Sequence, residues 1–326
     1  MQLMSRLQGG MGWNCRGWGW AAESIVGIDV VTAEGNSVHC SESSNPDLFW
    51  SARGSGPGFF GVVTQFHLQS RPIPPGLLAS TYVWDINEYD SVMPWVIETS
   101  RVANPDIEIV ALSLYPDHTY GTDLSEQRLN LVVHFLTFNP SIEIARKSLE
   151  LFADTVPRKE AALVIDEYQV TSIALECVDQ YKQNPTGHRY CADNAWIHSH
   201  LPTNEVVKAM RNVFVSLPST QTFTLYFNMA PERTLPDMAL SLQTEHYLAV
   251  YSIWKDAKDD EKCQSWMRKR FDEMQPYSAG VYLGDSDFQV RKTPFLAPGR
   301  REKLETIRKV WDPHGLFCSY LGLEKE

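Results

Sequence analysis

The sequence of 326 residues has no apolar run long enough to cross a membrane. It also lacks a cluster of lysines and arginines, and 40 acidic against 29 basic residues give a net charge of −11. We therefore expect neither nucleic acid nor an anionic membrane as a partner. Residues 1–8 lack the charged and apolar pattern of a signal peptide, so the default expectation is a cytoplasmic location.

The six cysteines are scattered, and no two of them form a C-x-x-C pair. This distribution predicts neither a zinc site nor a disulfide framework. His198 and His200 form a His-x-His pair, but no third ligand stands at a useful spacing from them. We read both as residues of a strand, and the sequence predicts no metal site.

Glycine is concentrated between residues 9 and 64, beginning with Gly9-Gly10-Met11-Gly12. Glycines this dense mark backbone that adopts positive φ or that lies directly against another group. A short helix between the two glycine-rich segments is predicted by Asn45 as its cap and Pro46 at its first position. Taken one at a time, such glycines indicate only the turns of an ordinary α/β unit.

The ordered combination of these segments resembles the FAD-linked oxidases of the berberine-bridge-enzyme-like and oligosaccharide-oxidase group, which have a PCMH-type FAD-binding fold. That family has a Gly-Gly-Gly-x-Gly loop, an Arg-x-x-Gly segment, a strand ending near Ala-Asp-Gly, and then Asp-Leu-Phe-Trp-Ala-x-Arg-Gly and Phe-Gly-Val-Val-Thr. The positions in register here are Arg16, Gly19, Ala33, Gly35, 47–50, Arg53, Gly54 and 60–64. The segments 280–288 and 311–317 also match the family pattern.

The resemblance begins midway through the FAD-binding domain. The family's Arg-x-Gly-Gly-His-type loop and the histidine that often carries the flavin have no counterpart in this sequence. Two alternatives stay open: a sequence whose N-terminal part is missing, or a naturally shortened relative without redox activity.

Three prolines between Arg71 and Gly76 predict a stiff connector and a domain boundary. Beyond it, strands alternate with helices in the order expected for an antiparallel sheet with helices on one face. The predicted strands cover 62–68, 79–84, 107–115, 128–138, 190–200, 223–229 and 245–254, and the predicted helices 88–102, 141–152, 204–217, 263–274 and 301–310.

The fold class is therefore α+β. We expect a partial PCMH-type FAD-binding domain at 1–75, a substrate-binding domain at 76–290, and a C-terminal helix and tail at 291–326 that packs back on the FAD-binding domain.

The resemblance implies FAD as the cofactor, held mainly by backbone groups. The positions that match the family's cofactor-binding segments are Gly9, Gly10, Gly12, Gly19, Ala22, Gly61, Val62 and Val63. For Val62 and Val63 the alternative is plain strand packing, and both roles are compatible. Trp13, Trp18 and Trp20 flank the glycines and are suited to shield a flavin from water, but we favour packing as their only role.

An oxidase of this kind also needs a group that accepts the substrate's hydroxyl proton. Polar residues on the predicted strands and in the family stretch before the C-terminus are Tyr226, Asn228, Glu245, His246, Tyr247 and Tyr282. A tyrosine with a lowered pKa, or a histidine near the ordinary value of about 6.5, is able to accept such a proton. Alternation places Glu245 and Tyr247 on the face opposite His246. Each residue also has a purely structural explanation, because buried tyrosines and histidines often only complete hydrogen bonds.

We select Tyr282 as the first candidate, followed by Tyr226 and His246, because the stretch around Tyr282 matches the family segment that runs past the flavin ring. The sequence thus predicts an FAD-dependent oxidase. In this hypothesis hydride passes from an alcohol or sugar-like small molecule to the flavin, and electrons then pass to molecular oxygen. The alternative is a flavin-free relative that binds a metabolite or guides a redox-neutral cyclisation.

Overall fold

The computed structural model describes residues 7–116, 124, 127–230 and 233–320. Its contacts divide the chain into two compact units. The first, which we call the glycine-rich unit, consists of Met1–Pro72, Arg233–Gln243 and Gly280–Glu326. The second, the sheet unit, consists of Ile73–Glu232 and Thr244–Ala279. Both contain antiparallel sheets and helices, which confirms the α+β prediction.

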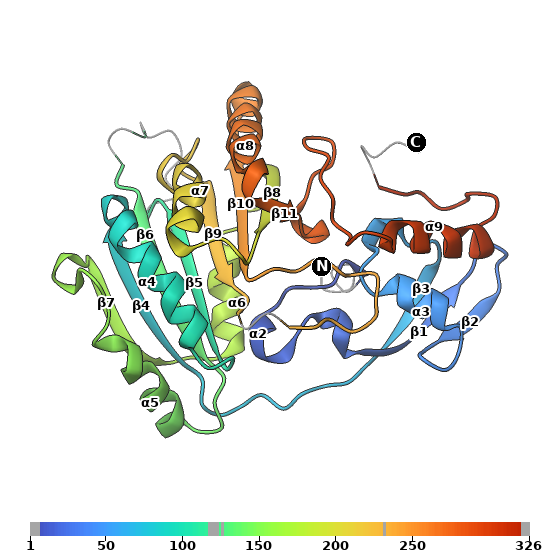
Figure 1. Cartoon of the computed structure of the whole chain (residues 1–326), viewed down its shortest axis with the longest axis horizontal. Helices are drawn as coiled ribbons and strands as arrows, with labels where there is room; N and C mark the ends of the chain where they lie inside the picture. The colour runs from blue at the N-terminus through green and yellow to red at the C-terminus, as the bar shows by residue number, and fades with distance from the viewer. Residues whose placement is uncertain (1–6, 117–123, 125–126, 231–232, 321–326) are drawn as a thin grey trace. The chain divides into compact units, whose positions relative to one another are not determined.

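The glycine-rich unit contains a three-stranded antiparallel sheet of order β2-β1-β3 (Figure 1). Its strands are β1 (Ile25–Val31), β2 (Ser37–Cys40) and β3 (Val62–Leu68), and its helices are α2 (Cys15–Trp18), α3 (Pro46–Ala52) and α9 (Arg300–Trp311). Helices α3 and α9 pack together, and Trp311 Nε1 donates a hydrogen bond to Asp47 at 2.9 Å. As predicted, α3 begins after Asn45 with Pro46 at its first position. The Asn45 side chain, however, donates to the carbonyl of His39 rather than capping the helix.

The segment 233–243 packs on the end of α3. Leu240 N donates to Arg53 O at 2.9 Å, and Ala239 N donates to Trp50 O at 3.2 Å. Gly54 has φ +121°, and a Cβ there would lie 2.1 Å from Leu240 N, so this crossing needs glycine. Residues 233–243 and 280–290 are predicted above to belong to the substrate-binding domain, whereas the contacts of the structure group them with the glycine-rich unit.

The sheet unit is built on eight strands in the order β11-β8-β10-β9-β5-β6-β4-β7. They are β4 (Leu78–Asp85), β5 (Ile107–Leu114), β6 (Asn130–Thr137), β7 (Val164–Val170), β8 (Arg189–Ile197), β9 (Phe223–Asn228), β10 (His246–Trp254) and β11 (Ser278–Gly280). Every predicted strand is present, but β8 ends at Ile197. The prediction that His198 and His200 are strand residues is therefore wrong, because both follow the strand.

Four helices cover one face of this sheet: α4 (Tyr89–Val102), α5 (Ile142–Ala153), α7 (Thr203–Val215) and α8 (Asp260–Met274). Phe135 of β6 marks this face, since its ring lies 5.7 Å from Trp95 of α4 and 6.1 Å from Phe152 of α5. Complete burial of a side chain such as Phe135 stabilises the fold by about 1.5–3 kcal/mol. Helix α5 starts as predicted at Ser141, whose Oγ accepts a hydrogen bond from Ile144 N at 3.2 Å.

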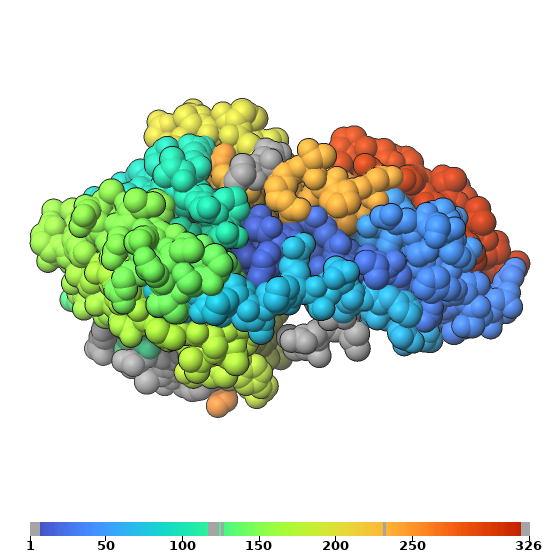
Figure 2. Space-filling model, turned by 90° about the horizontal axis from the view of Figure 1, so that it is seen from below, coloured from blue at the N-terminus to red at the C-terminus, as the bar shows by residue number. Residues whose placement is uncertain are grey.

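The fifth helix, α6 (Ile173–Lys182), differs from the other four. Its Glu176 lies 3.3 Å from Nε2 of His134, which alternates with Phe135 on β6 and so belongs to the opposite face. Neither α6 nor β7 was predicted from the sequence. Much of β7, an edge strand, is exposed, and its side chains show no clear alternation of buried and exposed positions. The surface formed by α5, β7 and α6 is shown in green tones in Figure 2. Within the described residues, no helix is both long and apolar enough to cross a membrane.

Candidate functional site

The glycine loop at residues 9–12 is fixed to the turn before β1 by backbone hydrogen bonds. Ala22 N donates to Gly9 O at 2.8 Å, and Ala21 N donates to Gly10 O at 2.9 Å. Gly9 and Gly10 have φ values of +114° and +74°. Two consecutive residues with positive φ require glycine, because a Cβ would strain the backbone at each.

Tyr282 lies over this loop. Its hydroxyl oxygen accepts a hydrogen bond from Gly10 N at 3.0 Å, and the amide of Met11 also interacts with it. Consecutive backbone N–H groups that meet at one oxygen form a concave site for a polar or anionic oxygen. Burial raises the pKa of Tyr282 well above its ordinary value, and the two amides only partly oppose this effect. The phenol is therefore protonated at neutral pH, the reverse of the lowered pKa that a proton-accepting tyrosine needs.

Trp20 forms a wall of the same loop. Its ring is fully buried, lies 4.9 Å from the Tyr282 ring, and is held by a hydrogen bond of 2.6 Å from Nε1 to Gln243 Oε1. A Cβ at Gly9 would lie 3.0 Å from the Leu240 side chain and 3.3 Å from Trp20. The loop is thus closely packed on one side, and the sequence assignment of Trp20 to packing agrees with these contacts.

Gly19 and Glu23 form the next turn. Gly19 has φ +85°, and a Cβ there would lie 2.4 Å from Glu23 Oε1. Glu23 accepts the N–H of Trp20 at 2.8 Å and forms an ion pair with Arg233 at 2.7 Å. The carboxylate of Glu23 therefore binds the protein's own backbone and Arg233.

The other predicted cofactor positions have different surroundings. Gly12 is exposed and a Cβ there would meet nothing within 4 Å. A Cβ at Gly61 would lie 2.5 Å from Val30, so packing against β1 accounts for this glycine. Val62 is 53% exposed, and Val63 pairs with Val30 across the sheet. The structure thus brings Gly9, Gly10 and Ala22 together, while Val62 and Val63 pair with the end of β1 and Gly61 packs against it.

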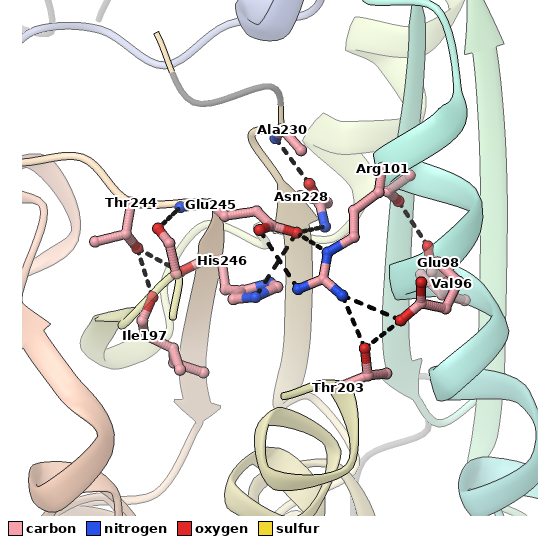
Figure 3. Close-up of polar contacts among 12 residues, drawn as sticks. Val96, Glu98, Arg101, Ile197, Thr203, Asn228, Ala230, Thr244, Glu245 and His246 are labelled. Carbon is pink, nitrogen blue, oxygen red and sulfur yellow. Dashed lines mark hydrogen bonds and ion pairs between the residues drawn. The ribbon is translucent and has the colours of Figure 1, made fainter. Parts of the chain in front are cut away.

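The sheet unit contains a buried polar network at the end of β9 and the start of β10, which Figure 3 shows in part. Tyr226 Oη and His246 Nδ1 are 2.7 Å apart, and both side chains are fully buried. Asn228 accepts a hydrogen bond from Ala230 N at 2.7 Å, which fixes its amide so that Nδ2 donates to Tyr226 Oη at 3.1 Å. Tyr226 Oη is thus hydrogen-bonded to both Asn228 and His246.

Glu245 and Arg101 extend this network to the helices. Arg101 Nε donates to Glu245 Oε1 at 2.5 Å, and that oxygen lies 3.8 Å from Nε2 of His246. Arg101 Nη1 also donates to Thr203 at 2.8 Å and to Glu98 at 3.0 Å (Figure 3). Burial lowers the pKa of His246 to about 4, although the charge of Glu245 opposes the shift. The imidazole is consequently neutral at physiological pH.

The candidate residues on β9 and β10 lie on two different faces of the sheet. Tyr226 and His246 lie on the face that the helices cover, while Tyr247 points to the opposite face and contacts Trp196 at 4.7 Å between ring centroids. The expectation that Glu245 points away from His246 is wrong. Glu245 precedes the first residue of β10 and its N–H donates to Ser199 Oγ, so strand alternation does not apply to it.

The structure therefore brings two of the three candidate proton-handling residues together. Tyr226 and His246 form a pair in the sheet unit, whereas Tyr282 belongs to the glycine-rich unit. Arg101 was not predicted from the sequence, because it lies 144 positions from its partner Glu245 and no local motif marks it.

No protein-family model matches the chain. It is 34% identical over 319 residues to the FAD-linked oxidoreductase penO of Penicillium crustosum, covering 97% of this chain and 68% of that protein. It is 41% identical over 119 residues to the (R)-6-hydroxynicotine oxidase of Paenarthrobacter nicotinovorans, covering 36% and 24% of the two chains. The solved structure of Physcomitrella patens BBE-like 1 matches with a TM-score of 0.75 at 17% identity, covering 99% of this chain and 70% of that one, and so shares the fold. The family predicted from the glycine-rich segments is confirmed: the chain belongs to the FAD-linked oxidoreductases, whose cofactor is FAD.

Proposed function

We propose that this chain oxidises an alcohol or sugar-like small molecule and uses molecular oxygen as the final electron acceptor. The observation that carries the proposal is the glycine loop, in which the amides of Gly10 and Met11 meet at one oxygen atom. Such a site suits a phosphate oxygen or a polar edge of a flavin ring, and FAD has both. In the structure the hydroxyl oxygen of Tyr282 takes this position, which supports the proposal that the two amides are able to bind an oxygen atom.

In the proposed reaction the substrate's C–H bond gives up a hydride and its hydroxyl gives up a proton, so that a C=O bond forms. FAD, when bound, would supply the acceptor for this hydride and the route for its two electrons to oxygen, which takes up two protons to form hydrogen peroxide. The chain's own residues bind and orient these partners. The Gly10 and Met11 amides hold an oxygen, and Trp20 and Leu240 close one side of the loop against water.

We propose different roles for the three candidate proton-handling residues. Tyr282 keeps its proton at neutral pH, so we propose that its phenol donates a hydrogen bond to the substrate or the cofactor. His246 is neutral and able to accept a proton, but it is fully buried on the helix-covered face and its Nδ1 is engaged by Tyr226. We therefore propose that Tyr226 and His246 position the ends of β9 and β10, and that Tyr282 is the catalytic residue.

The test is to titrate the purified chain with FAD and to follow bound flavin by absorbance. We expect saturable binding in the wild type and about tenfold weaker binding in Gly10→Ala, because a Cβ at φ +74° would displace the loop amides that are proposed to bind the cofactor. Gly35→Ala is the matched control, because Gly35 has a similar φ of +81° and a Cβ there would meet no atom within 4 Å.

The enzymatic step is tested by oxygen uptake and hydrogen peroxide formation with a panel of alcohols and sugars in the presence of FAD. A Tyr282→Phe variant that binds FAD normally and loses turnover supports the proposed role of the phenol. A folded chain that takes up no FAD and consumes no oxygen would contradict the proposal. In that case, thermal stabilisation of the flavin-free chain by a member of the panel would support the metabolite-binding alternative.

A further inference from the structure

A second group of polar side chains lies on the small sheet of the glycine-rich unit, one on each strand. Asp29 is on β1, His39 on β2 and His67 on β3. Asp29 is directly opposite His39, and His67 is opposite Gly27, two residues before Asp29. Since alternate residues of a strand share a face, all three side chains point to the same side of the sheet.

The three side chains are already in contact. Asp29 Oδ1 lies 2.7 Å from His39 Nδ1, and Asp29 Oδ2 lies 3.0 Å from His67 Nε2. One ligand atom from each residue falls within 4.8 Å of the other two. Bonds of about 2.0–2.2 Å from one ion would bring these atoms to roughly 3.5 Å from one another, which needs only small side-chain rotations.

Gly27 makes room for this arrangement. It is buried between the two histidine-bearing strands, and a Cβ there would lie 3.0 Å from Cε1 and 3.4 Å from Nε2 of the His39 ring. Its φ is not in the positive range, so backbone conformation does not require a glycine here. The absence of a side chain instead allows the imidazole of His39 to lie close to the central strand, beside Asp29.

We propose that Asp29, His39 and His67 form a binding site for a divalent transition-metal ion, with zinc as the best fit. Two imidazoles and one carboxylate are donors that suit Zn²⁺, whereas Mg²⁺ and Ca²⁺ prefer oxygen ligands alone. The side chains of Asp29, His39 and His67 are 29%, 51% and 38% exposed, so the remaining coordination positions face water. The ion would exchange with solvent and would join all three strands.

This site could not be found by sequence spacing. Asp29 is 10 residues from His39 and 38 residues from His67, and no zinc motif has these intervals. The expectation of no metal site was based on the spacing of the cysteines and on the His198–His200 pair. Among the residues that the structure describes, only Asp29, His39 and His67 meet the geometric requirement for three converging ligands.

The direct test is calorimetric titration of the full chain with zinc chloride after treatment with EDTA. We expect one zinc ion per chain, about tenfold weaker binding in Asp29→Asn, and loss of measurable binding in the double variant His39→Gln/His67→Gln. The matched control is His198→Gln/His200→Gln, which removes another close histidine pair with ring centroids 5.1 Å apart and should leave zinc affinity unchanged. Magnesium chloride should give no binding heat to any of these proteins.

Two further measurements separate the site from general effects on folding. Zinc should raise the melting temperature of the wild type but not that of the double variant, whose circular dichroism without metal should match the wild type. Gly27→Ala keeps every ligand but displaces the His39 ring, so it should weaken zinc binding several-fold. Equal zinc affinity in the wild type and the double variant, or no zinc binding by the EDTA-treated wild type, would overturn the proposal. FAD uptake is a separate readout and should be unchanged in Asp29→Asn.

Discussion

The two units each contain a cluster of histidine and carboxylate, and burial gives the clusters opposite properties. In the glycine-rich unit, Asp29 meets His39 and His67 on an open face of a sheet, and hydrogen bonds from the two imidazoles lower the pKa of the carboxyl. In the sheet unit, Glu245 and His246 lie under helices, and burial lowers the pKa of the imidazole to about 4. Exposed groups of this kind can exchange their hydrogen-bond partners for water and ions, whereas buried groups keep the partners that the fold places beside them.

The largest expected effect is at Arg101, because its removal leaves the Glu245 carboxylate, whose side chain is only 13% exposed, without its closest cation. We expect Arg101→Ala to lower the free energy of unfolding by about 3 kcal/mol in urea denaturation. Arg211→Ala is the control. Its ion pair with Asp90 is 47% and 59% exposed and should contribute about 0–1 kcal/mol. Equal costs for the two variants would mean that burial does not make the Arg101–Glu245 ion pair more important than an exposed one.

The next effect is a pH dependence from His246. Its pKa is about 4 in the folded chain and near the ordinary value of about 6.5 in the unfolded chain, so the unfolded state binds more protons between these values. Stability from the neutral imidazole is therefore complete above about pH 6.5 and is lost as pH falls toward 4, by about 3 kcal/mol at most. Urea denaturation at several pH values measures this slope.

His246→Gln should flatten the decline between pH 6.5 and 4, whereas His314→Gln, which changes an exposed histidine, should leave it as in the wild type. If the free energy of unfolding of His246→Gln falls between pH 6.5 and 4 as steeply as that of the wild type, a group other than His246 takes up the proton.

The smallest effect is expected at the exposed cluster without metal. Asp29→Asn should leave the free energy of unfolding nearly unchanged in EDTA, because exposed ion pairs contribute little. The difference between wild type and Asp29→Asn should grow when zinc is added, since only the wild type retains all three proposed ligands. A large loss of stability in EDTA would show that the cluster is a structural ion-pair network in its own right.

Local patterns predicted much of the secondary structure. The cap at Ser141, the proline at the start of α3 and the alternation along β9 and β10 each act within a few residues, and the structure has elements at these places. β7 and α6 were missed because a partly exposed edge strand and the helix after it do not show a strong apolar period. The roles of the candidate site residues stay predictions, since they depend on a substrate and a cofactor.

The sequence by itself determined the family, because the motifs that identify it are short runs of neighbouring residues. It also determined where the backbone adopts positive φ, because glycine favours this conformation locally. Tertiary structure alone decided which distant side chains meet. Arg101 reaches Glu245, Tyr282 reaches the Gly10 amide, and Asp29 reaches His67 only through strand register and helix packing. These contacts depend on partners far apart in the chain, and no local pattern encodes the register that joins them.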